Sequence, residues 1–409
     1  MYKHGNFILL ALFITTFYFQ LMNIYIKPLN QYAFNQYNKS EQSYPADYAE
    51  SAVPAISLYE RCREQAAVLV ASLDDPLLAA QCLLAGWDNR PYMTSAMLAY
   101  ISGIPAGGVM LFGQNLDAPR DEIRSFINDI AAVITAMSGV PPFIAVDHEG
   151  GLVHRFGPGM TRLPAPSVFW DMAKEDEASA LRILEELAAF SGLEMYDLGV
   201  NLNLAPVAEI LTEENIGFLG TRSYGPDIVF AEKAASAFIR GMNMSGIACT
   251  LKHFPGSGSS DPHFETGVIA IDQSLAELVQ PFSGIIRSLG PAAIMISHAV
   301  VAAVDPYSNA SLSHQVINGW LKNELGFEGI ALADDFNMAA VTGLSPEEAA
   351  IQALNAGIDM VICWPSNMAN IHNAILDALE DGSLSRERLI DAAERILTQK
   401  LILFSRGLI

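Results

Sequence analysis

The stretch IACTLKHFPGSGSSDPHFETG, residues 247–267, joins a short apolar run to a loop that is rich in ionisable and turn-forming residues. The apolar part predicts a strand buried on both faces, as strands of parallel sheets are. Lys252 and His253 follow this run directly, and two acids and a second histidine come later in the loop. Polar residues at the carboxyl ends of strands form the active sites of parallel α/β proteins. The stretch therefore predicts a parallel α/β fold with chemistry at this strand end.

Six further apolar runs indicate buried parallel strands in the same way. They are GGVMLF (107–112), FIAV (143–146), VNLNL (200–204), AIMIS (293–297), GIALA (329–333) and DMVIC (359–363). The segments between the runs are long enough for crossover helices. One helix start is marked by Ser345 and Pro346, which fit the N-cap and first helical positions, and Ser385 starts a last helix. The pattern predicts seven strands, and an eighth is not apparent.

Polar residues follow each of these runs. The sequences after them include VDHEGG, NLAPVAE, SHAV, ADDF and WPS. The carboxyl ends of the strands in a (β/α)8 barrel meet at one rim, where the active site lies, so the pattern predicts a TIM-like (β/α)8 barrel. The alternative, a doubly wound open sheet, would place fewer of these loops around one cleft. No glycine-rich nucleotide-binding pattern follows any run, so a nucleotide cofactor is not expected.

The composition restricts the class of partner. The chain has 409 residues, 51% of them apolar, and a net charge of −22. Such a surface repels nucleic acid and gives no general attraction to anionic lipid, so we expect no nucleic-acid partner. A neutral substrate suits this charge better, and we expect a monomer.

The four cysteines show no metal-binding spacing. Cys249 and Cys363 lie inside apolar runs and are expected to be buried thiols, whereas Cys62 and Cys82 could pair in an oxidising compartment. No cluster of acids and histidines has the spacing of a metal site either. The sequence therefore predicts no metal and no other cofactor.

The N-terminus carries the uncharged run FILLALFITTFYFQLMNIYI, residues 7–26. About 20 apolar residues are enough to cross a bilayer. We predict a signal anchor or a cleaved signal peptide at 1–26, a polar linker at 27–53 and the barrel at 54–409. The barrel is then exported, either anchored to a membrane and facing the periplasm or cell exterior, or secreted if the segment is cleaved.

The rim residues together suit a sugar site. Carboxylates bind paired hydroxyl groups, and two catalytic groups can flank a glycosidic bond. The ionisable residues at the predicted rim are Asp147, Glu149, Arg222, Lys252, His253, His298, Asp334 and Asp335.

At the level of whole motifs, the chain resembles family 3 glycoside hydrolases, in particular the single-domain branch that contains bacterial β-N-acetylglucosaminidases. The resemblance rests on VDHEGGLVHRF (146–156), GTRSYGPD (220–227), KHFPGSGSS (252–260) and GFEGIALADDFNM (326–338). It implies a TIM-like barrel and a retaining exo-β-glycosidase that removes terminal β-linked N-acetylglucosamine, for example from peptidoglycan or chitin fragments. A β-glucosidase or β-xylosidase is the nearest alternative, and a catalytically silent protein that binds wall glycans is another.

The resemblance also implies roles for single residues. Asp334 matches the nucleophile, with an alanine before it where the family has serine, and Asp147, Arg222, Lys252 and His253 match substrate-binding positions. Glu149 and Asp335 are expected to be structural. His298 could contact sugar or cap its strand.

The acid/base loop departs from the family pattern, which places an Asp-x-His pair after KHFPGHG. Ser257 replaces the histidine of GHG. In an ungapped alignment, His263 takes the place of the aspartate and Glu265 that of the catalytic histidine, so Glu265 is the preferred proton carrier with His263 as its partner. A two-residue gap instead restores the family order as Asp261 and His263.

Overall fold

The computed structural model describes residues 57–157, 159–270, 274–338 and 343–405. The predicted anchor at 1–26 and the linker at 27–53 lie outside this range, and so do the first residues of the predicted barrel. Across the described residues, no helix combines the length and the apolar character that crossing a membrane requires.

Eight parallel strands form the centre of the fold, in the order β10-β1-β2-β3-β4-β5-β7-β9. They are β1 Leu83–Gly86, β2 Gly108–Leu111, β3 Phe143–Val146, β4 Leu202–Asn203, β5 Ala248–Phe254, β7 Ala293–Ile296, β9 Ile330–Ala333 and β10 Val361–Cys363. A parallel bridge between Leu332 and Met360 joins the two ends of this order. The sheet therefore closes, which confirms the predicted TIM-like barrel over the open doubly wound sheet.

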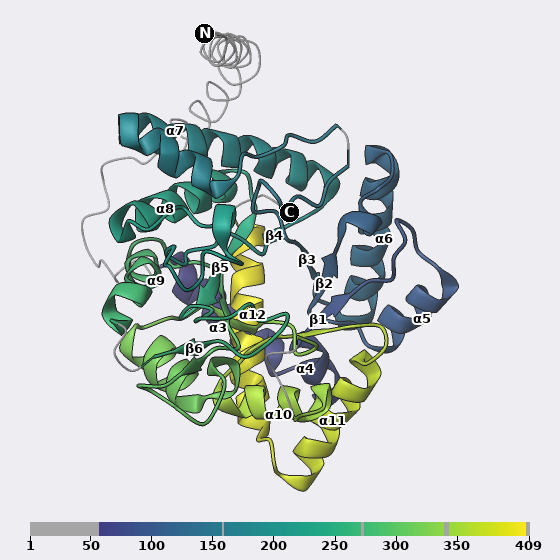
Figure 1. Ribbon diagram of the computed structural model, residues 1–409. Coiled ribbons are helices and arrows are strands. Elements are labelled where there is room, and N and C mark those ends of the chain that lie inside the picture. The colour runs from purple at the N-terminus through teal and green to yellow at the C-terminus, as the bar shows by residue number, and fades with distance from the viewer. Residues whose placement is uncertain (1–56, 158, 271–273, 339–342, 406–409) are drawn as a thin grey trace, which may run out of the picture. The chain divides into compact units, whose positions relative to one another are not determined.

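Helices pack around the strands. They are α3 Leu58–Val70, α4 Asp75–Gln81, α5 Ser95–Gly103, α6 Arg120–Ser138, α7 Pro166–Leu198, α8 Ile228–Met244, α9 Leu275–Leu289, a helical segment η5 Gln315–Glu324, α10 Pro346–Ala356, α11 Met368–Asp381 and α12 Arg386–Ser405. In Figure 1, α5 to α11 lie towards the outside of the view, while α3, α4 and α12 are seen near its centre. The predicted starts are confirmed: Ser345 forms a capping box with Glu348 at α10, and the Ser385 side chain accepts from Arg388 at α12.

The strand that sequence reading did not find is β1. It has four residues and is separated from α4 only by Cys82, so no turn signal separates it from the helix. A short apolar run beside a buried helix end cannot be assigned by periodicity alone.

The strand of the opening stretch is longer than predicted, because the sequence placed Lys252 and His253 after its end. Lys252 and His253 belong to β5 itself, whose register against β7 shifts between Leu251 and Phe254. This irregularity lets the last residues of the strand carry polar side chains into the site.

All four cysteines are buried and free. The burial of Cys249 and Cys363 confirms that prediction. Cys62 and Cys82 are not paired, so the disulfide left open by the sequence does not form in this structure.

Candidate active site

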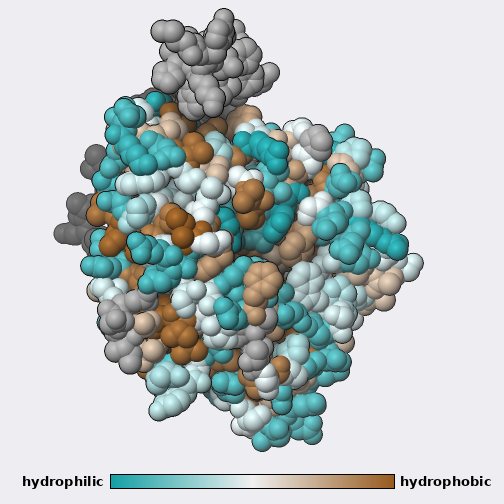
Figure 2. All heavy atoms as spheres, viewed as in Figure 1, coloured by the Kyte–Doolittle hydropathy of each residue, from teal (hydrophilic) through white to brown (hydrophobic). Residues whose placement is uncertain are grey.

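A cavity of about 410 Å³ opens at the carboxyl ends of the strands. Figure 2 shows a hollow with hydrophilic residues near the centre of the visible face. The residues around it come from the carboxyl-terminal parts of the strands and from the loops that follow them: Met110, Phe112, Asp147, Glu149, Val153, Arg155, Phe218, Leu219, Arg222, Lys252, His253, Ser257, Asp261, Pro262, His263, Met295, Asp334, Asp335, Met338, Ile362 and Trp364. The structure thus gathers every predicted site residue except Glu265 and His298 around this cavity.

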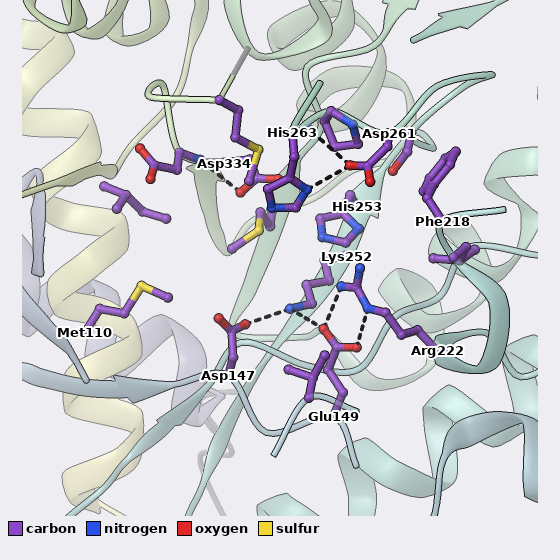
Figure 3. Close-up of a pocket in the computed structure, with 18 of the residues that line it drawn as sticks. Met110, Asp147, Glu149, Phe218, Arg222, Lys252, His253, Asp261, His263 and Asp334 are labelled. Carbon is purple, nitrogen blue, oxygen red and sulfur yellow. Dashed lines mark hydrogen bonds and ion pairs between the residues drawn. The ribbon is translucent and has the colours of Figure 1, made fainter. Parts of the chain in front are cut away.

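A buried charge network forms one wall of the cavity, as Figure 3 shows. The Lys252 Nζ atom lies 2.7 Å from Oδ1 of Asp147 and 2.8 Å from Oε1 of Glu149. The Arg222 guanidinium donates two bonds of 2.8 Å to the Glu149 carboxylate. Burial alone would raise the pKa of Glu149, but Lys252 and Arg222 lower it to about 2. Glu149 therefore holds both cations in place, as expected of a structural residue.

Asp147 is the more accessible acid of this wall. Its Oδ1 atom accepts a hydrogen bond from Nζ of Lys252 at 2.7 Å, and Nη2 of Arg155 lies 3.6 Å from its Oδ2 atom. Although burial lowers the pKa of Lys252, the carboxylates of Asp147 and Glu149 raise it above its ordinary value. The lysine stays charged beside Asp147, an arrangement that can hold neighbouring hydroxyl groups of a sugar.

Asp334 follows β9 directly and is 7% exposed. Its Oδ1 accepts a 2.9 Å hydrogen bond from the backbone N–H of Asp335. Burial by itself raises the pKa of Asp334, but His253, His298 and this hydrogen bond together lower it below the ordinary value. A buried carboxylate that stays ionised at the base of a cavity can act as a nucleophile.

The neighbouring His298 and Asp335 are held by other protein groups. His298 is buried, with Nδ1 2.7 Å from Oγ of Ser311 and Nε2 3.1 Å from the carbonyl oxygen of Asp335. Burial lowers its pKa. Asp335 lines the cavity, but its Oδ2 accepts from Nε1 of Trp364 at 2.9 Å and its Oδ1 accepts from Asn337. Both contacts fit structural roles.

The acid/base loop places only some of its candidates at the cavity. Asp261 and His263 line the cavity, with Oδ1 of Asp261 2.8 Å from Nδ1 of His263. Burial raises the pKa of Asp261, but hydrogen bonds from His263 lower it overall. His263 and Glu265 are both exposed, but of the two only His263 lines the cavity within the described chain. This geometry fits the gapped alignment, in which Asp261 orients His263, and it differs from the preferred ungapped one.

Two residues were missed by sequence reasoning: Trp364, which lines the cavity, and Glu209, which contacts the cavity residue His253. Trp364 stacks on Phe112 with ring centroids 5.2 Å apart. Its place depends on Gly86 of β1, where a Cβ atom would lie 2.6 Å from the indole. Glu209, at the end of the NLAPVAE segment, binds His253 through Nδ1 at 2.7 Å. A polar residue after a strand was a signal for Glu209, whereas the packing of Trp364 on Gly86 has no local signal.

Comparisons with known proteins agree with this geometry. The model of the glycosyl hydrolase family 3 N-terminal domain matches residues 84–399. A beta-hexosaminidase of Stenotrophomonas maltophilia (strain R551-3) is 33% identical over 289 residues, which is 69% of this chain and 82% of that protein.

Two solved structures are also similar. A family 3 beta-N-acetylglucosaminidase from Paenibacillus sp. str. FPU-7 superposes with a TM-score of 0.75 and 28% identity, over 81% of this chain and 64% of that one. Beta-N-acetylhexosaminidase from Beutenbergia cavernae DSM 12333 gives a TM-score of 0.72 and 30% identity, over 81% of this chain and 99% of that one.

Proposed function

The chain belongs to glycosyl hydrolase family 3, and we propose that within it the protein is a retaining exo-β-N-acetylglucosaminidase. Its class, a glycoside hydrolase of the β-hexosaminidase type with a carbohydrate substrate, follows from the family and its relatives. The observation that carries the finer proposal is that a buried ionised carboxylate, Asp334, and a hydrogen-bonded Asp261–His263 pair line the same cavity.

In this proposal the first chemical step forms a covalent intermediate. A carboxylate oxygen of Asp334 attacks the anomeric carbon while the glycosidic C–O bond breaks, and His263 donates a proton to the departing oxygen. Asp261 accepts from Nδ1 of His263 and so orients the ring for this transfer.

In the second step His263 takes a proton from a water molecule, and the resulting hydroxide attacks the anomeric carbon. The bond to Asp334 breaks, the carboxylate is regenerated and the sugar leaves with its original anomeric configuration. Asp147, Arg222, Lys252 and His253 bind the hydroxyl groups of the sugar during both steps, which their place along the cavity supports.

The proposed substrate is a terminal β-linked N-acetylglucosamine of a peptidoglycan or chitin fragment. The names of the relatives support this sugar, since two of them are a beta-N-acetylglucosaminidase and a beta-N-acetylhexosaminidase. A cavity of about 410 Å³ lies in the usual range for one small ligand, which suits an exo-acting enzyme. A protein that only binds glycans has little use for a buried ionised Asp334.

We also propose that residues 7–26 anchor the protein in a membrane and that the barrel is exported. The support is the uncharged run in the sequence, which is long enough to span a bilayer. Cell fractionation tests this, and recovery of the full-length chain in the soluble cytosolic fraction would contradict it.

The proposed activity is tested with residues 45–409 on a panel of nitrophenyl sugars. The β-N-acetylglucosaminide should be hydrolysed fastest, and Asp334→Asn should abolish the reaction. Faster turnover of the β-glucoside or β-xyloside would assign one of those activities instead, and binding without turnover of any sugar would indicate a silent glycan-binding protein.

A further inference from the structure

The carboxylate of Glu209 contacts two parts of the site at once. Its Oε1 lies 2.7 Å from Nδ1 of His253 and accepts from Oγ of Ser257 at 2.9 Å, while its Oε2 accepts from the backbone N–H of Ser257 at 2.6 Å. Glu209 is 4% exposed. A buried carboxylate is tolerated only when such donors satisfy it, so these three contacts fix its position closely.

We propose that Glu209, through Ser257, is a positioning residue that ties the sugar-binding His253 to the loop carrying the proton-transfer pair. This inference rests on the proposed function, since the proposed function is what assigns proton transfer to Asp261 and His263.

The first half of this link fixes the histidine. An ionised carboxylate can only accept, so the proton of the His253 ring lies on Nδ1 and points at Glu209. Burial raises the pKa of Glu209, but His253 and Ser257 lower it below the ordinary value, so the carboxylate remains ionised. The Nε2 atom of His253 is thereby left for the cavity that this residue lines.

The second half fixes the base of the loop. The two ends of segment 257–267 touch, since a Cβ on Gly267 would lie 2.1 Å from the carbonyl oxygen of Ser257. A Cβ on Gly258 would likewise lie 2.8 Å from the backbone nitrogen of Val268. Ser257 therefore sits at the closed base of a loop whose middle carries Asp261 and His263, and a shift at this base moves both residues.

A purely structural role for Ser257 and a positioning role predict different kinetics. Loss of folding stability reduces the amount of active enzyme and affects every substrate equally. A displaced proton donor affects most the substrates with poor leaving groups, because a good leaving group departs without protonation. The ratio of rates on two substrates therefore separates the two roles.

The test uses the full-length chain and two substrates, nitrophenyl β-N-acetylglucosaminide and a β-1,4-linked disaccharide of N-acetylglucosamine. Ser257→Ala should lower kcat/KM on the disaccharide about tenfold more than on the nitrophenyl sugar, the size expected for one hydrogen bond to a charged group. Glu209→Gln should lower both rates, because it also releases His253, and should show the same bias against the disaccharide.

Ser223→Ala is the matched control. The Ser223 hydroxyl is buried and donates a 2.8 Å bond to Glu209 as well, but to its backbone carbonyl oxygen. This variant should leave the ratio of the two rates unchanged. Equal losses on both substrates in Ser257→Ala, or the same bias in Ser223→Ala, would overturn the inference.

Hydrogen exchange gives a second readout that does not need turnover. Amides of segment 258–266 should exchange several-fold faster in Ser257→Ala than in wild type or Ser223→Ala. If the wild type hydrolyses no sugar, the proposed function fails, while faster exchange would still show that Ser257 anchors the loop. Unchanged exchange would overturn the anchoring itself.

Discussion

The Nδ1 atom of His263 lies 2.8 Å from Oδ1 of Asp261, two residues earlier in the same loop. The same Asp261 oxygen also accepts from the backbone N–H of His263 at 3.0 Å. Both side chains line the cavity that holds Asp334, as Figure 3 shows. Glu265 follows two residues later and is not among the described residues that line this cavity. The loop therefore presents an Asp-x-His pair to the cavity.

His263→Ala should lower the rate on a natural disaccharide roughly 10²–10⁴-fold, the usual contribution of general acid–base catalysis. The loss on a nitrophenyl sugar should be much smaller, because nitrophenolate leaves without protonation. Added azide should restore part of the nitrophenyl rate by attacking the covalent intermediate in place of activated water. Steady-state kinetics on both substrates measure this.

Glu265→Gln serves as the comparison within the same loop. Its rates on both substrates should stay close to those of wild type. A strong leaving-group dependence in this variant, with a normal His263→Ala enzyme, would restore the ungapped alignment.

Asp334→Asn should reduce kcat on the order of 10⁴-fold or more, as loss of a nucleophile does in other covalent mechanisms. A 2-fluoro sugar with a good leaving group should label a peptide containing residues 329–338, found by mass spectrometry. NMR of the first product should show the original anomeric configuration. Inversion of that configuration would exclude the covalent route.

Glu149→Gln should destabilise the protein by about 3–5 kcal/mol at pH 7, because it leaves Lys252 and Arg222 buried without their common partner. Since the pKa of Glu149 is lowered from 4.5 to about 2, its contribution is fully present above about pH 4.5 and is lost as the pH falls towards 2. The difference in unfolding free energy between wild type and variant should therefore shrink below pH 4.5.

Urea denaturation at pH 7, 4 and 3 measures this difference. Asp171→Asn is a suitable control, because the Asp171–Lys174 pair is largely exposed and should contribute less than about 1 kcal/mol at any pH. A difference for Glu149→Gln that stays constant from pH 7 to pH 3 would refute the role of its ionisation.

Gly86→Ala should raise KM and cost about 1–3 kcal/mol of stability, as overpacking does. The new Cβ would lie 2.6 Å from Cε3 of Trp364, so the indole must move. Movement would strain the 2.9 Å bond from Trp364 Nε1 to Asp335, beside the nucleophile. Thermal denaturation and Michaelis–Menten kinetics report the two effects.

Gly103→Ala is its matched control. Gly103 lies in α5, and a Cβ there meets nothing within 4 Å. Both stability and KM should stay near their wild-type values. Equal KM values for the two alanine variants would show that Trp364 does not shape the sugar site.

The sequence by itself determined the barrel and the general place of the site. Strands buried on both faces are apolar throughout, so β2, β3, β7 and β9 are recognisable in the sequence as short apolar runs. Because parallel strands of a barrel all point the same way, their carboxyl ends lie at one rim. Asp147 and Asp334 could therefore be assigned to one cavity from their positions after these runs.

Tertiary structure alone decided which side chains meet within that cavity. The choice between His263 and Glu265 depends on the conformation of a loop without periodicity, and the Glu209–His253 contact joins residues 44 positions apart. The packing of the Trp364 indole against Gly86 depends on how β10 pairs with β1. The spacing of apolar residues indicates which face of a helix or strand is buried. Hydrogen bonds and close packing between distant segments depend on three-dimensional distances, which no local sequence pattern predicts.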